Sequence, residues 1–377
     1  MSSQARFVEW DEDGRACRAC WRSLAGLPPP RRVVLADDRM PADAAFRLAA
    51  EGTALLWRGD FHNARQLLQA MARRIDRKPR RADPAAVIAA EDFHRYRIGQ
   101  AQRARTLGMV LLPFDADFHI PLRRAPEARD ACLAAHGRVE EGFVASLREL
   151  QGLIGAYEWR KKGVPVPALD ARIHPHYGVF APVRGEYVDL VAKSPIPTPC
   201  RLAFDVGTGT GVLAALLARR GASRVVATDC DARALTCAAE NIRNLGLAGR
   251  VEVVNADLFP PGQADLIVCN PPWLPGRPAT PLERAVYDPD SRMLHGFIAG
   301  LRAHLAPRGE AWLILSDLAE HLGLRSRESL LAAFEQAGLR VARRLDARPA
   351  HPRAADLGDA LHAARSRETT SLWRLEA

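Results

Sequence analysis

The stretch FDVGTGTGVL, residues 204–213, decides the fold of this chain. An apolar run leads into Gly207, Gly209 and Gly211, and an apolar helical pattern follows directly. Glycine permits a tight turn and lets a ligand approach the backbone, and the N-terminus of the next helix favours a negatively charged group. The stretch therefore predicts a strand, a ligand-binding loop and a helix over about residues 211–220.

Short β-like runs alternate with helical patterns beyond this loop. A parallel sheet covered by helices on both faces produces this rhythm, and its ligands bind at the carboxyl ends of the strands. The glycine spacing is GxGxG, whereas the dinucleotide fingerprint is GxGxxG, so the pattern speaks against a dehydrogenase. The predicted strands cover residues 201–206, 224–229, 251–256, 264–270, 310–317, 338–346 and 369–376.

Two acids stand at the ends of successive predicted strands. Asp229 ends the second strand, where a carboxylate can accept hydrogen bonds from both hydroxyls of a ribose. Asp257 follows the third strand and can accept one from an exocyclic amine, with Leu258 and Phe259 against the flat face of a purine. Together they predict an adenosine pocket, and the alternative is that each acid only caps a turn.

The stretch IVCNPPW, residues 267–273, ends the fourth predicted strand in an unusual way. An amide or ring amino nitrogen is a poor nucleophile because its lone pair is delocalised. The side-chain oxygen of Asn270 and the backbone carbonyl of Pro271 can accept its two hydrogens, which directs the lone pair at a methyl group. Pro272 offers no competing N–H, and Trp273 can stack on a planar substrate. The alternative is a proline turn with Asn270 as its cap and Trp273 in the core.

The order of DVGTGTG, Asp229, NADLF and NPPW resembles the class I S-adenosylmethionine-dependent methyltransferases over about residues 174–377. The resemblance implies an α/β fold with a Rossmann-like seven-stranded sheet whose last strand, residues 369–376, runs antiparallel. It implies S-adenosyl-L-methionine as the cofactor, with the glycine loop and Asp205 at its methionine end. The residues expected to bind the cofactor are Phe180, Asp205, Gly207, Thr208, Gly209, Gly211, Asp229, Asp257, Leu258 and Asn270.

In that family an Asn/Asp-Pro-Pro-aromatic motif marks methyltransferases acting on planar nitrogens, which include protein glutamine, adenine N6 and guanine N2. The resemblance thus implies an N-methyltransferase with Asn270, Pro271, Pro272 and Trp273 as catalytic residues. We expect a macromolecular acceptor, first an rRNA base or a ribosome-associated protein. The alternatives are a protein glutamine N5-methyltransferase of the release-factor type and, from another class, a non-catalytic cofactor-binding scaffold.

The flanks of the motifs carry further likeness. HYGVFAPVRGEYVDLVA, residues 176–192, resembles the cofactor-covering entry segment of release-factor glutamine and rRNA guanine-N2 methyltransferases. The likeness makes Phe180 a wall of the methyl-transfer pocket, and Arg184 with Glu186 the pair that orders it. An acid-proline pair, Asp288 and Pro289, follows the NPPW motif as in the glutamine methyltransferases, although their Gly-rich continuation is absent.

The N-terminal part predicts a separate domain. Helical spacing dominates its clearest pattern, FHNARQLLQAMARRI at residues 61–75, so we expect a mainly helical substrate-recognition domain over residues 1–165. A methyltransferase domain over residues 166–377 follows, and the Pro- and charge-rich residues 160–178 look like a connecting segment.

A basic stretch stands out in that domain. Between Arg73 and Arg105 there are 10 basic and 4 acidic residues, with Tyr96 between Arg95 and Arg97. This composition predicts contacts with RNA phosphates, and the alternative is a solvated helix face.

Composition excludes several classes. With 377 residues and 48% apolar content the chain can bury a sizeable core. The sequence contains no run of about 18 apolar residues, which a membrane-spanning helix would need. Its acidic start is unlike a signal peptide, so we expect a cytoplasmic protein. The seven cysteines fit reduced thiols, and the pair Cys17 and Cys20 lacks a second pair of ligands, so we expect no metal site.

Overall fold

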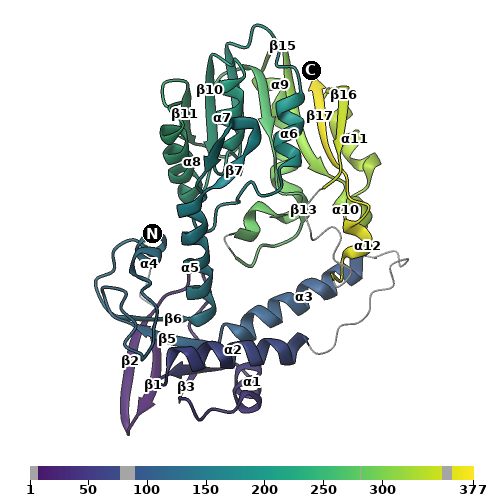
Figure 1. Ribbon diagram of the computed structural model, residues 1–377. Helices are drawn as coiled ribbons and strands as arrows, with labels where there is room; N and C mark the ends of the chain where they lie inside the picture. The colour runs from purple at the N-terminus through teal and green to yellow at the C-terminus, as the bar shows by residue number, and fades with distance from the viewer. Residues whose placement is uncertain (1–6, 77–89, 281, 350–358) are drawn as a thin grey trace. The chain divides into compact units, whose positions relative to one another are not determined.

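The computed structural model describes residues 7–76, 90–280, 282–349 and 359–377 (Figure 1). Its described residues pack as two compact units. The N-terminal unit comprises residues 7–76 and 94–158, and the C-terminal unit comprises residues 90–93 and 159–377.

A seven-stranded sheet forms the centre of the C-terminal unit. Its strand order is β11-β10-β9-β12-β15-β17-β16, and β17 runs antiparallel to both of its neighbours while the other pairs are parallel. The expected seven-stranded sheet with an antiparallel last strand is confirmed. The strands are β9 (Leu202–Val206), β10 (Arg224–Asp229), β11 (Val251–Asn255), β12 (Ala264–Cys269), β15 (Leu305–Ser316), β16 (Arg340–Ala347) and β17 (Thr370–Glu376).

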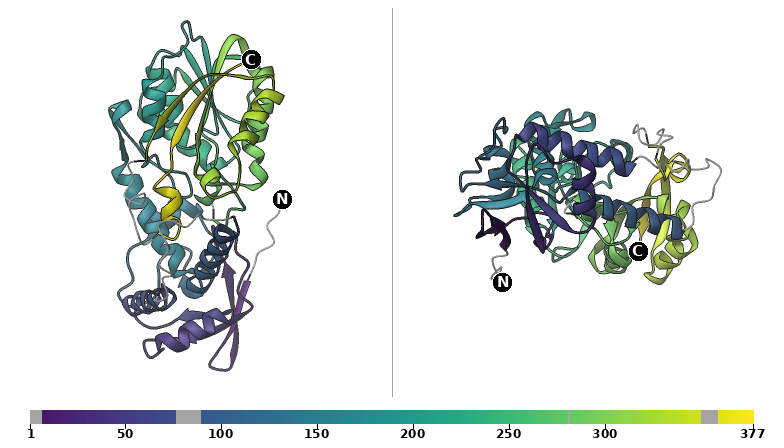
Figure 2. Two further views of the ribbon diagram at one scale, coloured as in Figure 1. Left: turned by 90° about the vertical axis from the view of Figure 1, so that its right-hand side faces the viewer. Right: turned by 90° about the horizontal axis from the view of Figure 1, so that it is seen from below.

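Helices cover both faces of this sheet (Figure 2). Successive strand side chains point to opposite faces, so Ala203 packs in one core layer and Phe204 in the other. One layer contains α6 (Glu186–Lys193), α7 (Val212–Arg219) and α8 (Ala232–Asn244), and the other contains α9 (Arg292–His304) and α11 (Arg327–Gln336).

The sequence explains why these helices pack as they do. Residues 212–218 of α7 are apolar all round and all buried, as expected of a helix enclosed on every side. Helix α8 instead buries one stripe, and the side chain of Asp231 accepts a hydrogen bond from Arg233 N as its N-terminal cap.

Short elements connect the main ones. Residues 160–178 were expected only to connect, yet they contain the paired strands β7 (Val164–Val166) and β8 (Ala171–Ile173) with the 3-10 turn η1 (Pro167–Leu169) between them. The other short elements are β13 (Leu274–Pro275), η2 (Leu282–Ala285), β14 (Tyr287–Asp288), η3 (Pro289–Ser291), α10 (Leu318–His321) and α12 (His362–Arg365).

The N-terminal unit contains a six-stranded mixed sheet in the order β1-β2-β6-β5-β4-β3. Helices contain more of its residues than strands, as expected, but this sheet was not predicted. Its strands are β1 (Phe7–Glu12), β2 (Arg15–Trp21), β3 (Arg32–Ala36), β4 (Thr53–Trp57), β5 (Val110–Phe114) and β6 (Phe143–Ser146). Its helices are α1 (Ala42–Ala50), α2 (Phe61–Asp76) and α4 (Arg129–His136), with most of α3 (Ala90–Leu107) and α5 (Leu147–Lys162).

The sheet was missed for a physical reason. A strand buried on both faces shows an apolar run without alternation, and β4, TALLW, is such a run because all five of its residues are buried. A run this short cannot be distinguished from a piece of helix by periodicity, whereas the 16-residue α2 has a long and clear helical pattern.

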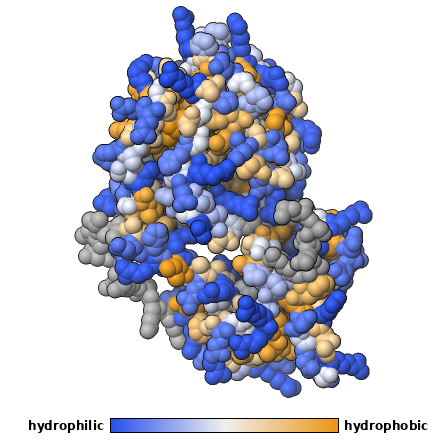
Figure 3. Space-filling model, turned by 180° about the vertical axis from the view of Figure 1, so that it is seen from behind, coloured by the Kyte–Doolittle hydropathy of each residue, from blue (hydrophilic) through white to orange (hydrophobic). Residues whose placement is uncertain are grey.

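The molecular surface seen in Figure 3 is mostly hydrophilic, with hydrophobic side chains in small separate areas. No helix within the described parts of the chain is long and apolar enough to cross a membrane.

Candidate functional site

The glycine loop follows β9 and uses conformations that suit glycine. Gly207, Gly209 and Gly211 have φ values of +73°, +55° and +80°. The backbone N–H groups of Gly207 and Thr208 donate to the carbonyl of Thr228 at 2.9 and 2.8 Å, which ties the loop to β10. A Cβ added at Gly209 would meet nothing within 4 Å, so the backbone at this position borders open space.

Asp205, the acid expected at the methionine end of the cofactor, lies buried beneath the glycine loop. It is 1% exposed, and its Oδ2 accepts hydrogen bonds from Thr208 Oγ1 at 2.6 Å and from Ala214 N at 2.9 Å. Gly211, the N-cap of α7, has no side chain to cap the helix, so the Asp205 carboxylate supplies the acceptor. Asp205 and Thr208 therefore shape the loop from beneath.

Burial dominates the electrostatics of this carboxylate. Burial, with a smaller contribution from the nearby Asp229, raises the pKa of Asp205 to about 6, although the hydrogen bonds from Thr208 and Ala214 oppose the rise. The charge of Asp205 is therefore stabilised only in part.

Asp229 stands where the sequence predicted it, at the carboxyl end of β10. Its Oδ2 accepts a hydrogen bond from Gly209 N at 3.0 Å, and its Oδ1 accepts one from Asp231 N at 2.9 Å. Burial raises the pKa of Asp229, and these backbone donors oppose the rise. The loop and the acid thus form one connected feature at the edge of the sheet.

The third element, NADLF, follows the prediction only in part. Asp257 is exposed, and the guanidinium of Arg292 at the start of α9 pairs with it at 2.6 Å. Leu258 is half-buried with φ +75°, and its carbonyl accepts a hydrogen bond from Thr228 Oγ1.

Phe259 was expected to lie against a purine, and this was wrong. Its ring stacks on His304 with centroids 4.3 Å apart and on Phe297 with centroids 5.6 Å apart. Both partners belong to α9, so the half-buried Phe259 packs against that helix and the core layer beside it. In the sequence, an aromatic residue after a strand is compatible with contact to a purine or with packing against a helix. The position of α9 decides between these two interpretations.

The NPPW motif leaves the sheet next to the glycine loop. Cys269 pairs with Val206 in register, so Asn270 and Gly207 follow neighbouring strand ends. The indole Nε1 of Trp273 donates a hydrogen bond to Asn270 Oδ1 at 2.9 Å. This bond fixes which side of the amide carries the oxygen, and that oxygen keeps one further lone pair to accept a second donor.

The rest of the motif is anchored in the fold. Pro271 is buried, while Pro272 and Trp273 are half-buried, and the Trp273 ring packs against both core layers. The chain then continues as β13, which pairs with β14.

The acid-proline pair has a structural explanation in this chain. The carboxylate of Asp288 is 5% exposed and accepts hydrogen bonds from Met293 N and Leu294 N, both at 3.1 Å. It therefore caps the first turn of α9 and connects that helix to the segment after the NPPW motif.

The entry segment contains the three residues expected there. Phe180 is half-buried against the core layer that holds α7. Arg184 Nε donates to Glu186 Oε1 at 2.7 Å, and the guanidinium carbon lies 5.0 Å from the centre of the Trp273 ring.

Polar contacts with α8 hold the beginning of this segment, and the sequence analysis did not foresee them. Asn241 Oδ1 accepts from His174 N at 2.8 Å, and Glu240 Oε2 lies 2.7 Å from His176 Nε2. Burial lowers the pKa of His176, and Arg160 adds to this shift while Glu240 opposes it. A helical Glu-Asn pair has no pattern of its own, so no signal in the sequence could have identified it.

The predicted RNA-contact region is only partly described. Residues 77–89 of the stretch from Arg73 to Arg105 lie outside the described residues. In the described part, Arg103 pairs with Asp76 at 2.9 Å, so the C-terminal turns of α2 and α3 meet. Arg73, Arg95 and Arg105 are exposed.

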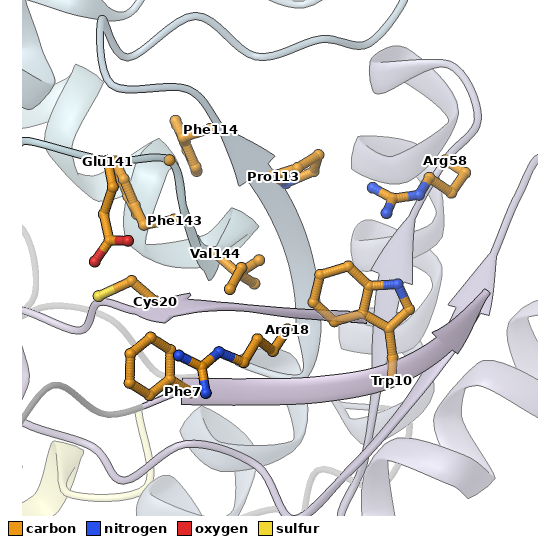
Figure 4. A pocket seen from close by; sticks show the side chains of 12 residues that line it. Phe7, Trp10, Arg18, Cys20, Arg58, Pro113, Phe114, Glu141, Phe143 and Val144 are labelled. Carbon is orange, nitrogen blue, oxygen red and sulfur yellow. The ribbon is translucent and has the colours of Figure 1, made fainter. Parts of the chain in front are cut away.

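A hollow of about 330 Å³ lies in the N-terminal unit (Figure 4). Side chains of β1 and β2 border it together with Arg58, Phe114, Glu141 and Phe143. The Arg18 guanidinium lies over the Phe7 ring, 4.5 Å from its centre. The residues that line this hollow include none from the glycine loop or the NPPW motif.

Cys17 and Cys20 lie on β2, three residues apart, so their side chains point to opposite faces of the strand. Within the described ranges no group of three or more His, Cys, Asp or Glu side chains is arranged to bind a metal ion.

Comparison with known proteins decides the family. The chain is 30% identical over 262 residues to the release factor glutamine methyltransferase of Cereibacter sphaeroides, which covers 63% of this chain and 83% of that protein. The model of the methyltransferase small domain matches residues 173–341. The chain belongs to the class I S-adenosylmethionine-dependent methyltransferases. It is therefore an enzyme, its cofactor is S-adenosylmethionine, and a non-catalytic scaffold is not supported.

Other relatives of this methyltransferase act on different acceptors. It is 32% identical over 135 residues to the tRNA1(Val) (adenine(37)-N6)-methyltransferase of Pedobacter heparinus, covering 32% of this chain and 58% of that protein. Among solved structures it resembles a ribosomal protein L11 methylase from Lactobacillus delbrueckii subsp. bulgaricus, at 20% identity and a TM-score of 0.37, over 56% of this chain and 89% of that one.

The residues of this methyltransferase fit its cofactor. Positive-φ glycines leave open space at Gly209, which a bulkier residue would fill. The Asp229 carboxylate can accept hydrogen bonds from ribose hydroxyls. The exposed Asp257 can accept one from the adenine amine once its ion pair with Arg292 opens.

Proposed function

We propose that this methyltransferase transfers the methyl group of S-adenosylmethionine to a planar nitrogen, an amide or ring amino group, of a macromolecular acceptor. The observation that carries the proposal is the Trp273–Asn270 hydrogen bond at the end of β12, the strand next to β9 and its glycine loop. It supports a site in which the amide oxygen is held in one orientation before the acceptor binds.

The chain contributes orientation rather than proton abstraction. Bound S-adenosylmethionine supplies a methyl group on a positively charged sulfur. The remaining lone pair of Asn270 Oδ1 accepts one hydrogen of the acceptor nitrogen, and the Pro271 carbonyl accepts the other. The half-buried Trp273 ring offers a face on which a planar acceptor can stack. The nitrogen–carbon bond forms as the carbon–sulfur bond breaks, which leaves a neutral thioether. Asparagine cannot take up a proton at neutral pH, so the proton that the methylated nitrogen loses goes to solvent.

For the acceptor we propose RNA, with an rRNA base as the first candidate. The exposed arginines of α2 and α3 and the formal charge of +9 support contacts with phosphates. The relative from Pedobacter heparinus is named for an adenine N6 of tRNA, which is a planar amino nitrogen.

Protein glutamine is the second candidate. The observation that favours it is that the chain matches 83% of the length of the release factor glutamine methyltransferase. Both candidates present the same type of nitrogen to Asn270.

One experiment separates the two acceptors. The protein is incubated with tritiated S-adenosylmethionine and a lysate of a strain that lacks it, and the product is treated with ribonuclease or with protease. Label released by ribonuclease alone supports RNA, and label released by protease alone supports the glutamine alternative. Absence of label in both fractions contradicts a macromolecular acceptor.

Asn270→Ala tests the mechanism in the same assay. We expect the rate of methyl transfer to fall at least about 100-fold, because the acceptor loses its orienting oxygen, while the Kd for S-adenosylmethionine stays within about twofold. Asn244→Ala is the matched control, since Asn244 is an exposed asparagine at the end of α8 in the same unit. Unchanged turnover in Asn270→Ala would reject the proposed mechanism.

A further inference from the structure

A buried carboxylate far along the chain contacts the entry segment. Arg184 Nη2 donates to Glu368 Oε1 at 3.0 Å, in addition to its bond with Glu186. The Arg184 side chain is 18% exposed, and the side chains of Glu186 and Glu368 are 6% and 2% exposed. Because all three are largely shielded from water, these ion pairs are screened much less than surface pairs.

Glu368 also joins two other parts of the sheet. The same Oε1 accepts a hydrogen bond from Ser316 Oγ at 2.7 Å. Ser316 is the last residue of β15, and Glu368 directly precedes Thr369 and the start of β17. One oxygen atom thus connects the entry segment, the carboxyl end of β15 and the chain entering β17.

The connection continues to the proposed catalytic residues. The Arg184 guanidinium lies over the Trp273 ring, and the Trp273 indole donates to Asn270 Oδ1. A guanidinium over an indole face is attracted by the ring quadrupole, and the attraction grows when the pair is removed from water. Movement of Arg184 would therefore change the position of Trp273 and, through it, the orientation of the Asn270 amide.

We propose that Glu368 is a positioning residue for methyl transfer. It holds Arg184 over Trp273 and thereby fixes the direction of Asn270 Oδ1. Glu186 alone would leave the guanidinium free to turn about its bond to one carboxylate, whereas two carboxylates on Nε and Nη2 define its plane. This inference rests on the proposed function, because it assigns Asn270 Oδ1 the role of acceptor.

Glu368→Gln tests the proposal, and Glu376→Gln is its matched control. Glu376 is the last residue of β17, the strand that follows Glu368, and it forms an exposed ion pair with Arg340. We expect Glu368→Gln to lower kcat by about tenfold, with the Kd for S-adenosylmethionine within about twofold of wild type. Glu376→Gln should leave both values unchanged. Equal kcat in the two variants overturns the proposal.

A second readout does not depend on activity or on the identity of the acceptor. In protein labelled with ¹⁵N, the indole resonance of Trp273 is assigned by its absence in Trp273→Phe. We expect this resonance to shift in Glu368→Gln and to stay in place in Glu376→Gln. An unmoved resonance in Glu368→Gln overturns the proposal.

Glu368→Asp and a comparison with Asn270→Ala cover two further outcomes, a Glu368→Gln variant that does not fold and a failure of the proposed function. If Glu368→Gln does not unfold cooperatively, Glu368→Asp replaces it, because aspartate keeps the charge but cannot reach both donors, and the resonance should shift again. Loss of turnover in Asn270→Ala together with wild-type behaviour in both Glu368 variants rejects this inference alone. Retained turnover in Asn270→Ala rejects the proposed function instead.

Discussion

At the scale of the residue, Asp205 shows what burial does to a motif acid. Its carboxylate is enclosed, caps α7 and accepts a hydrogen bond from the hydroxyl of Thr208. A charged group in this position opposes folding at neutral pH unless its hydrogen bonds compensate fully.

The raised pKa of Asp205 predicts a pH dependence of stability. The value is about 6 in the folded chain against 3.8 for an ordinary Asp, so the folded state binds more protons between these values. The stabilising contribution is therefore complete below the unfolded value and is lost as the pH rises through about 6, a change of about 3 kcal/mol in the free energy of unfolding.

Asp205→Asn isolates this contribution, because its amide oxygen can still accept from Thr208 and Ala214. We expect the difference in unfolding free energy between variant and wild type to rise in favour of the variant from about pH 4 to about pH 7. Urea unfolding at several pH values measures it. Asp189→Asn, at an exposed position of α6, is the control, and the difference for Asp205→Asn should exceed the one that it gives. A flat difference for Asp205→Asn would contradict the prediction.

At the scale of the element, substitution of two glycines in the same loop should have different effects on stability and on cofactor binding. Gly209 borders open space, whereas a Cβ at Gly211 would lie 3.3 Å from the Cα of Ala238 in α8. Alanine at either position meets the cost of positive φ, about 1 kcal/mol, but only at Gly211 does it also press on a helix backbone.

We therefore expect Gly209→Ala and Gly211→Ala to separate binding from stability. Gly209→Ala should lose about 1 kcal/mol of stability and at least about tenfold in affinity for S-adenosylmethionine, because the methyl group enters the space beside the loop. Gly211→Ala should lose about 2–3 kcal/mol of stability. Chemical unfolding and calorimetric titration measure the two quantities, and equal stability losses would contradict the assignment.

The elements of the C-terminal unit were predictable where a local pattern is long enough to decide. The run before Gly207, the glycine spacing and the acid at Asp229 all lie within or next to single strands, so the sequence alone places them at one sheet edge. The side chains of Phe259 and Glu368 depend on partners far along the chain, His304 and Arg184 among them. Nothing near them in sequence indicates these partners, so they could not be predicted.

At the scale of the whole molecule, the proposed RNA acceptor makes the position of the exposed arginines testable. The exposed arginines at the ends of α2 and α3 belong to the N-terminal unit, and the motif residues belong to the other unit. Binding and methyl transfer should therefore respond to different substitutions.

The double variant Arg73→Gln and Arg105→Gln tests this division. We expect weaker RNA binding and a slope of log K against log salt that is shallower by up to about 2, because each lost phosphate contact removes about one from the slope. Binding of a fluorescent rRNA fragment between low and moderate salt measures it. Arg201→Gln with Arg308→Gln, two exposed arginines at the amino ends of β9 and β15, should leave the slope unchanged. Equal slopes in all variants would argue against RNA contact through this region.

The antiparallel strand β17 has a consequence for how this enzyme can change over time. Because β17 is antiparallel, it begins at the carboxyl edge of the parallel strands, so the connection from β16 to β17 lies at that edge. The glycine loop and residues 270–291, which follow β12, begin at the same edge. The connections at the other edge are short: 220–223 precedes β10 and 337–339 precedes β16. Mutation can therefore lengthen or rewrite the first group and alter which molecule is methylated, while the second group preserves the sheet. New acceptors can evolve here without a new fold.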